Sequence, residues 1–386
     1  MSSPNLSTAS NWSPAQRKVR YLTKISKVEG LPEEERKKLE EVEKKFVFRV
    51  TDYYLDLIDW KDPDDPIRQL IIPRLDELND WGRLDASNEA SVTVAKGVQH
   101  KYPDTCLLLC NEVCGAYCRY CFRKRLFMND NDEVSLDVTE GIAYIREHEE
   151  ITNVLLTGGD PLLMAPKKLL DIIRQVRDIP HVKIIRLGSK MPAFNPFVIL
   201  NKPELLEGLA ELSRSDARIY LMAHFDHPRE LTPEALEAMD LVMRAGVTCV
   251  NQCPMIRGVN SSAETLTELY RKLSFAGIPP YYLFQGRPTE GNEAYEVPIV
   301  EGFKMFDEAR RRVSGLAARA RMAMSHEMGK IEILAIDEEF IYLRFHRAKN
   351  PADRGRFMVA ARNDDAFWFD QLEVVRSFPA SGPDAA

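Results

Sequence analysis

The sequence predicts an α/β protein built on a partial (β/α)6 TIM-type barrel, with a helical region before it and an α+β extension after it. From Thr105 onward, short apolar runs alternate with amphipathic helical segments, which is the pattern of parallel strands joined by helices. The preceding residues are highly charged with helical spacing, and those after residue 300 combine a helix with strand-like alternation. We place the three parts at residues 1–100, 101–290 and 291–386.

The first hundred residues are expected to form a tail and a helical region. Residues 1 to about 14 are polar, lack the basic and apolar regions of a signal peptide, and are expected to be disordered. The stretch LPEEERKKLEEVEKKFVFRV has a proline near its start and carries Leu39, Val42 and Phe46 at helical spacing. We therefore predict an amphipathic helix in this stretch.

Six apolar runs are predicted to be the parallel strands of the barrel. They are TCLLLC, NVLLT, VKIIRLG, RIYLMAH, GVTCVNQ and PYYLFQG, and a helix is expected near residues 166–178. Because active sites of such barrels lie at the carboxyl ends of the strands, the residues just after each run are expected to face one site. Those residues are Cys110 to Cys121, Gly158-Gly159-Asp160, Gly188-Ser189-Lys190, His224, Asn251-Gln252 and Gln285 to Arg287.

The C-terminal extension is predicted to mix helix and strand. The segment VEGFKMFDEARRRV has helical spacing, whereas GKIEILAIDEEFIYLRFH alternates in the manner of a hairpin. The last ten residues, SFPASGPDAA, are expected to be a disordered tail.

Charge, hydropathy and cysteine content exclude several classes of protein. The net charge of -7 gives no general affinity for nucleic acid. No apolar run approaches the roughly 20 residues that a membrane-spanning helix needs, so we expect a cytoplasmic protein without a membrane partner. Disulfides are rare in that reducing compartment, and clustered cysteines there predict metal binding or catalysis.

The segment CGAYCRYCFRKR, at residues 114–125, holds Cys114, Cys118 and Cys121. Three thiolates can bind three irons of a four-iron cluster and leave the fourth iron open to a small ligand. The alternative is a zinc site completed by Cys110, but Cys110 ends an apolar strand and cationic side chains flank the loop, which favours the cluster. The remaining cysteines are interpreted as small buried residues: Cys106, Cys249 and Cys253.

The loop and several later segments carry a family resemblance. With Tyr120 and Phe122 on either side of Cys121, the loop resembles the cluster loop of the radical S-adenosylmethionine (SAM) enzymes. More narrowly, the chain resembles the lysine 2,3-aminomutase family. The segments that carry this resemblance are DPDDPIRQLIIP, KYPDT, CGAYCRYCFRKR, LLTGGDPLL, IIRLGSKMP, HFDHPRELT, NQCPMIRGVN, PPYYLF and MGKIEI, which cover about residues 60–335.

The resemblance implies a radical mechanism and a set of SAM-binding residues. The open iron of a 4Fe-4S cluster would bind the amino and carboxylate groups of SAM, and one electron would split SAM into methionine and a 5′-deoxyadenosyl radical. Gly158 and Gly159 would let the backbone approach the methionine moiety, with Asp160 near its ammonium. The other family positions near SAM are matched by Ser189, His224 and Gln252. The alternatives are an ordinary turn for the glycines and a structural role for His224.

The resemblance also implies pyridoxal 5′-phosphate (PLP), capped by the C-terminal extension. In this family the substrate's amino group is held as an imine on PLP, and the nitrogen moves from the α- to the β-carbon after the radical removes a hydrogen. The segment MGKIEI places Lys330 at the lysine that holds PLP, although a solvent-facing lysine is the alternative. Arg123 matches the arginine that grips the substrate carboxylate. Lys101 and Arg119 match cationic residues around the phosphate and the cluster.

Departures from the family pattern restrict what the resemblance implies. The glycine-rich run before the PLP lysine is replaced by MSHEM, and Thr105 stands where the family has an arginine. No cysteine follows Cys253, so we predict no zinc. The two aspartates that receive the distal ammonium of lysine correspond to Arg287 and Ala323, which favours glutamate or another acidic amino acid over free lysine.

The sequence thus predicts a radical SAM amino-acid 2,3-aminomutase, an isomerase that acts on a small-molecule amino acid. We expect a homo-oligomer and an electron donor of the flavodoxin or ferredoxin type. Two alternatives remain: an aminomutase acting on a protein-bound lysyl group, and a cluster-bearing homologue without PLP catalysis. In the substrate argument, Glu290 and Glu293 could restore carboxylates, and Arg287 could turn toward the PLP phosphate to replace the arginine absent at Thr105.

Overall fold

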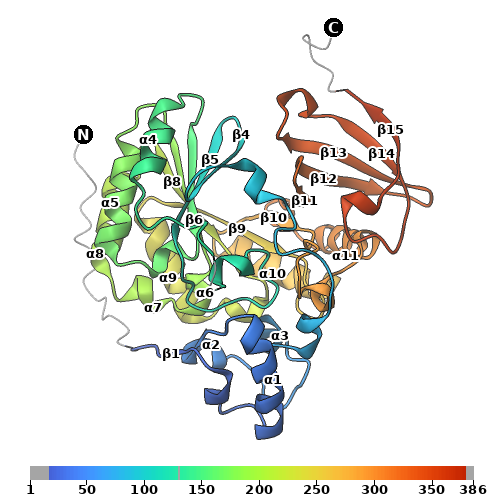
Figure 1. The fold of residues 1–386 in the computed structure, drawn as a ribbon, viewed down its shortest axis with the longest axis horizontal. Helices are drawn as coiled ribbons and strands as arrows, with labels where there is room; N and C mark the ends of the chain where they lie inside the picture. Colours follow the sequence, from blue (N-terminus) through green and yellow to red (C-terminus); the bar gives the residue numbers. More distant parts are fainter. Residues whose placement is uncertain (1–16, 129–130, 380–386) are drawn as a thin grey trace.

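A single 13-stranded sheet organises the computed structural model, which describes residues 17–128 and 131–379 (Figure 1). Its strands β3 to β15 lie side by side in the order in which they occur along the chain. Strands β5 to β11 run parallel to one another, and the strands on both flanks are antiparallel. The structure is therefore a mixed α/β fold with a large parallel sheet, as predicted.

The six predicted strands are all present in the parallel part of the sheet. They are β5 (Thr105–Asn111), β6 (Asn153–Gly158), β7 (Ile184–Ser189), β8 (Arg218–Ala223), β9 (Thr248–Pro254) and β10 (Pro280–Phe284). A row of paired leucines, Leu108, Leu156, Leu187 and Leu221, crosses four of these strands. All four are buried, because helices cover parallel strands and make their apolar runs part of the core.

Helices connect the parallel strands and begin at residues suited to helix starts. They are α4 (Thr139–Glu147), α5 (Pro166–Arg177), α6 (Met191–Phe194), α7 (Phe197–Leu200), α8 (Pro203–Leu212), α9 (Pro233–Arg244), α10 (Ala263–Phe275) and α11 (Ile299–Arg311). Proline, whose fixed φ suits the first turn, opens α5, α8 and α9. The hydroxyls of Thr232 and Ser262 accept hydrogen bonds from the first turns of α9 and α10. The predicted helix near residues 166–178 is α5.

The N-terminal region holds helices α1 (Glu33–Lys45), α2 (Asp52–Leu55) and α3 (Pro66–Ile71), with the short strands β1 (Tyr21–Leu22) and β2 (Val50–Thr51). Figure 1 shows these elements, in blue, as a separate group beside the sheet. The predicted helix α1 buries Leu39 and Val42 and has glutamates in its first turn and lysines in its last, as the helix dipole favours. Strands β3 (Thr93–Ala95) and β4 (Val98–Tyr102) then enter the large sheet.

The C-terminal part continues the same sheet. Its strands are β11 (Arg321–His326), β12 (Gly329–Ile336), β13 (Phe340–Ala348), β14 (Phe357–Ala361) and β15 (Val374–Phe378). The predicted hairpin is confirmed as β12 and β13. The expected disordered tail was placed too early, because Ser377 and Phe378 pair with β14 as part of β15. Residues 1–14 and the end of that tail lie outside the described residues. No helix within 17–128 and 131–379 is long and apolar enough to cross a membrane.

Candidate active site

A cavity of about 340 Å³ is lined by side chains of the parallel strands and by the loops that follow their carboxyl ends. Both Thr105, at the start of β5, and the cysteine loop beyond its last residue line this cavity, so it extends along the strand for about 20 Å at ~3.3 Å per residue. The cavity brings together most of the predicted site residues: Lys101, Cys114, Cys118, Cys121, Arg123, Gly158, Gly159, Asp160, Ser189, His224, Gln252, Arg287 and Lys330.

We divide this central cavity into two ends. The thiol end, beyond the carboxyl ends of the strands, contains Cys114, Cys118, Cys121, Tyr120, Asp160, Ser189, Lys190 and His224. The lysine end, near the start of β5 and against β12 and β13, contains Lys101, Tyr102, Thr105, Arg186, Lys330 and Arg347.

The three clustered cysteines face the cavity as free thiols. Burial raises the pKa of Cys118 to about 12, and burial also raises the pKa of Cys114 and Cys121. A positively charged metal centre would oppose this effect and hold all three as thiolates, which is the donor set that iron–sulfur clusters use. Cys110 instead lies within β5, with its thiol directed at the carbonyl of Thr157 at 3.8 Å, and it does not line the cavity.

Gly158, which ends β6, and Gly159, which follows it, permit a close approach to the chain at and just after the end of β5. Gly158 has φ +104°, and a Cβ there would lie 2.6 Å from the carbonyl oxygen of Asn111. A Cβ on Gly159 would lie 2.5 Å from the carbonyl oxygen of Val113. Both contacts join the loop after β6 to the start of the cysteine loop, so glycine is needed here for packing as well as for any approach of a ligand.

Asp160 fixes the loop after β7 to the loop after β6. Its carboxylate accepts hydrogen bonds from the Ser189 hydroxyl at 2.8 Å and from the backbone N–H groups of Leu162 and Lys190 at 3.0 and 2.7 Å. Burial raises the pKa of Asp160 to about 6, and these hydrogen bonds oppose the rise. The structure therefore brings together two residues that were predicted near SAM, Asp160 and Ser189.

A buried network of charged groups supports the thiol end. Lys190 Nζ lies 2.6 Å from carboxylate oxygens of both Asp226 and Glu230. His224 Nε2 lies 2.9 Å from Asp226, and the Tyr120 hydroxyl donates a hydrogen bond to the same carboxylate. Burial opposes the charge on Lys190, but the two carboxylates outweigh burial and raise its pKa. Since Tyr120 lies between Cys118 and Cys121, this network anchors the cysteine loop.

Between the two ends, one glutamate contacts three arginines. Glu89 Oε1 lies 2.9 Å from Arg123 and 3.7 Å from Arg287, and Glu89 Oε2 lies 2.8 Å from Arg125. The Arg287 guanidinium also lies over the Phe122 ring, 3.6 Å from its centroid. Burial lowers the pKa of Arg287 to about 10. The two predicted substrate residues, Arg123 and Arg287, are therefore neighbours that share a carboxylate.

The carboxylates that could have restored a lysine-binding pocket lie elsewhere. Glu290 pairs with Lys45 at 2.6 Å, and Glu293 accepts a hydrogen bond from Asn79 at 3.2 Å. Neither lines the cavity. Ala323 is fully buried in β11. Among the described residues that line the cavity, seven are lysine or arginine and three are aspartate or glutamate.

At the lysine end, Lys330 lies on β12 among aromatic rings and cations. Its Nζ is 4.2 Å from the ring centroid of Tyr282 and 4.7 Å from that of Phe284. Burial, followed by the charges of Arg186 and Arg287, lowers the pKa of Lys330 well below its usual range. A neutral amine is the form that attacks a carbonyl, so Lys330 has the chemistry required to hold PLP. Burial also lowers the pKa of Lys101, to about 8.

Arg119 lies outside the cavity, unlike the other predicted cations. Its guanidinium binds Glu77 through two hydrogen bonds, of 2.7 and 3.0 Å, and donates a third to the carbonyl of Val47 at 3.0 Å. Arg119 therefore does not line the central cavity, and its expected role near the phosphate and the cluster stays a prediction. Because Glu77 is fully buried in the N-terminal region, it draws Arg119 away from the cavity and ties the cysteine loop to that region.

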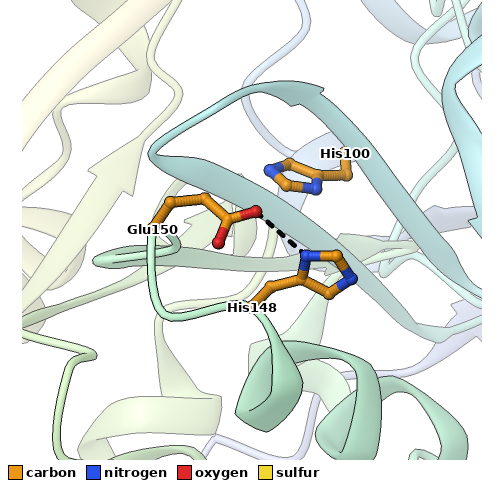
Figure 2. A group of neighbouring side chains, drawn as sticks. All are labelled: His100, His148 and Glu150. Atoms are coloured by element: carbon orange, nitrogen blue, oxygen red, sulfur yellow. Dashed lines mark hydrogen bonds and ion pairs between the residues drawn. The ribbon is translucent and has the colours of Figure 1, made fainter.

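Figure 2 shows a second group of possible metal ligands, His100, His148 and Glu150, outside the central cavity. His148 Nδ1 lies 2.9 Å from Glu150, while His100 Nδ1 meets the Tyr144 hydroxyl at 2.9 Å and Nε2 meets the carbonyl of Pro103 at 3.1 Å. Since both ring nitrogens of His100 already have partners, hydrogen bonding accounts for this group without a metal.

Charged residues that line or support the cavity, and that the sequence analysis did not single out, are Glu89, Arg186, Asp226, Glu230 and Arg347. Arg186 carried a usable signal, because it is a charge inside the apolar strand run VKIIRLG. Glu89 and Arg347 lie in segments whose patterns do not distinguish a cavity-facing charge from an exposed one.

A loop with three cysteines, set after the first parallel strand and open to a cavity within the sheet, defines the class of radical SAM enzymes. Residues 109–270 match the model of the radical SAM superfamily. Membership in this superfamily implies a 4Fe-4S cluster and SAM.

The chain belongs to the lysine 2,3-aminomutase family, whose members are isomerases. It is 54% identical over 368 residues to a "Putative L-lysine 2,3-aminomutase" from Aquifex aeolicus, covering 95% of this chain and 98% of that relative. It is 35% identical over 301 residues to the L-lysine 2,3-aminomutase of Clostridium subterminale, covering 77% of this chain and 71% of the relative. The glutamate 2,3-aminomutase of Clostridioides difficile is 32% identical over 296 residues, covering 76% and 68% respectively.

Proposed function

We propose that the protein is an amino-acid 2,3-aminomutase that uses SAM, a 4Fe-4S cluster and PLP. The observation that carries this proposal is that one cavity holds the three cysteines at one end and, at the other, Lys330, whose pKa burial lowers well below its usual range. When bound, the cluster and SAM supply a radical that abstracts hydrogen, and PLP supplies a ring that holds the amino group and delocalises an unpaired electron.

The residues of the chain would bind and orient these groups. Cys114, Cys118 and Cys121 would hold the cluster, and Lys330 would hold PLP. SAM would lie against the loops after the parallel strands, near Gly158, Gly159, Asp160, Ser189, His224 and Gln252. Unused polar atoms support this placement, because Gln285 Oε1 and Glu296 Oε2 line the cavity and have no hydrogen-bond partner within 17–128 and 131–379.

The charge of the cavity favours an acidic amino acid as substrate. Arg123 would bind the α-carboxylate through its planar fork, and Arg287 would pair with a carboxylate on the side chain. These two arginines share Glu89 with Arg125, so their combined charge exceeds what one carboxylate balances. Glutamate is therefore our first candidate, followed by neutral amino acids, and free lysine would be disfavoured by a cation facing its distal ammonium.

We further propose that strands β5 to β10 form a partial (β/α)6 barrel and that the chain divides into parts 1–100, 101–290 and 291–386. In this arrangement the third part caps the lysine end, because Lys330 and Arg347 lie on its strands β12 and β13. A flavodoxin or ferredoxin would supply the electron.

The test is an anaerobic assay of the reconstituted protein with SAM, dithionite, PLP and glutamate, aspartate, alanine or lysine separately. We expect a β-amino acid from glutamate at a higher rate than from lysine, measured by chromatography with mass spectrometry. The Arg287→Ala variant should lose the preference for glutamate. Cleavage of SAM without a β-amino acid from any substrate would overturn the aminomutase assignment and favour a cluster-bearing homologue.

A further inference from the structure

The position where the family has an arginine, Thr105, is covered by an arginine from another strand. Arg347 of β13 donates a hydrogen bond to the Thr105 hydroxyl at 3.2 Å and also pairs with the neighbouring carboxylate of Asp104. Its guanidinium lies 4.4 Å from the ring centroid of Tyr102, the last residue of β4. Arg347 thus places a guanidinium group beside Thr105, the position at which the family has an arginine.

Arg347 also faces Lys330 across the hairpin. The two residues are paired in the register of β12 and β13, and side chains of paired residues in antiparallel strands project from the same face. Both line the central cavity. A ligand bound to the Lys330 amine therefore meets the Arg347 guanidinium on the same wall of the cavity.

Arg186 is a part-buried cation near Arg347 and has no carboxylate partner among the described residues. It lies in β7, donates a hydrogen bond to the Asn153 side chain at 2.8 Å, and forms no ion pair with any residue in the described parts of the chain. Burial lowers its pKa, and the charge of Arg347 adds to that effect. Two cations close together in a partly buried site repel each other, and an anion between them would be attracted to both.

Tyr102 supplies a neutral donor at the same place. It is 7% exposed, and its buried hydroxyl has no hydrogen-bond partner in the part of the chain that the structure describes. Buried hydroxyl groups normally have a partner, so this one is available to a ligand in the cavity.

The nearby carboxylate does not balance these charges. The Asp104 side chain is 45% exposed and pairs with Arg347 at the rim, while Arg186 and Lys101 have no carboxylate partner among the ion pairs of the described residues. A phosphate carries up to two negative charges and several acceptor oxygens, which suits two guanidinium groups and a hydroxyl.

We propose that Arg347 and Arg186, with the Tyr102 hydroxyl, form a phosphate-binding site at the lysine end that replaces the arginine absent at Thr105. This inference rests on the proposed function, because the phosphate is taken to be that of PLP held by Lys330. Arg287 is a weaker candidate for this role, because it already pairs with Glu89 and lies over the Phe122 ring, whereas Arg186 has no carboxylate partner among the described residues.

The test compares PLP with pyridoxal, which has the same aldehyde and no phosphate. Each is titrated into the reconstituted full-length protein, and binding is followed by the absorbance change and by borohydride reduction with mass spectrometry of the Lys330 peptide. We expect wild-type protein to prefer PLP. Arg347→Ala and Arg186→Ala should each weaken PLP binding about 10- to 100-fold and leave pyridoxal binding unchanged, as for loss of a charge-assisted hydrogen bond.

Three further variants make the result specific. Arg344→Ala removes an arginine from the same strand that pairs with Glu332 outside the cavity, and it should bind PLP as wild type does. Adding Thr105→Arg to Arg347→Ala should recover part of the lost affinity. Tyr102→Phe, which removes one oxygen, should weaken PLP binding a few-fold and tests the site if the arginine variants do not fold.

Each outcome has a defined meaning. If Arg347→Ala and Arg186→Ala bind PLP as tightly as wild type, or weaken pyridoxal equally, the phosphate site is overturned while the aminomutase assignment stands. If PLP binds through these residues but no amino acid rearranges, the aminomutase assignment fails and the phosphate site stands. Failure of wild-type protein to bind PLP overturns both.

Discussion

The two ends of the central cavity differ in how their charges are balanced. At the thiol end, Lys190 is enclosed by the carboxylates of Asp226 and Glu230, and Tyr120 and His224 complete the same network. At the lysine end, Arg186 is partly buried and has no carboxylate partner among the described residues. The charges of the first end are therefore balanced by the chain itself, whereas the second keeps unpaired positive charge that an anionic ligand would stabilise.

The sharpest test of the thiol end is removal of single cysteines. We expect Cys114→Ala, Cys118→Ala and Cys121→Ala to lose the 4Fe-4S cluster after anaerobic reconstitution, because each removes one of three thiolate ligands. Cys110→Ala is the matched control and should retain it, since Cys110 lies in β5 away from the cavity. Iron and sulfide content and the visible spectrum measure the outcome. Loss of the cluster in Cys110→Ala would assign a fourth ligand and favour a zinc-like site.

At the lysine end, Lys330→Ala should abolish covalent attachment of PLP while leaving the cluster intact. Borohydride reduction followed by mass spectrometry should find the pyridoxyl adduct on Lys330 in wild type and no adduct in the variant. Lys304→Ala, an exposed lysine on α11, is the control. If the Lys330→Ala variant rearranges an amino acid at the wild-type rate, the proposed role of Lys330 in holding PLP is wrong.

The contrast in charge balance predicts a large loss of stability when Lys190 is removed. Lys190→Met leaves Asp226 and Glu230 buried without their cation and should lower the free energy of unfolding by about 3–5 kcal/mol. Lys167→Met breaks an exposed pair with Asp171 and should cost at most about 0.5 kcal/mol. Urea denaturation of the cluster-free protein measures both. Equal effects of the two substitutions would show that the buried network around Lys190 does not stabilise the thiol end.

The smallest expected effect concerns pH and Lys101. Its folded pKa is lowered to about 8 from a usual value of 10.5, so the unfolded chain holds the proton at pH values where the folded chain has lost it. The contribution of Lys101 to stability therefore rises from pH 8 to 10.5. Lys101→Met should be more stable than wild type by about 1–2 kcal/mol at pH 7, with a smaller difference at pH 10. If the difference in free energy of unfolding between Lys101→Met and wild type does not change with pH, Lys101 does not carry an uncompensated charge in the folded protein.

The strands and the cysteine loop could be predicted because their signals are local. An apolar run between polar turns indicates a strand wherever it occurs, and the spacing of Cys114, Cys118 and Cys121 restricts the chemistry. The same reasoning predicted that Asp160, Ser189 and His224 share one site, since the carboxyl ends of parallel strands lie on one side, and all three line the cavity.

The charge pairings could not be predicted because they depend on partners distant in sequence. Arg119 and Arg123 are four residues apart and look equivalent in the sequence, yet one binds Glu77 and the other binds Glu89. Arg347 reaches Thr105 only because β13 returns antiparallel to β12. Such choices depend on which buried carboxylate or strand lies within reach after folding.

The continuous sheet has a consequence for how the protein is made. Its strands lie in the order of synthesis, and Lys330 follows Cys121 by 209 residues. At a translation rate of about 5–20 residues per second, Lys330 leaves the ribosome roughly 10 to 40 s after the cysteine loop. Throughout that interval the nascent chain lacks β12 and β13, which carry Lys330 and Arg347, so the lysine end can form only after the cysteine loop has left the ribosome.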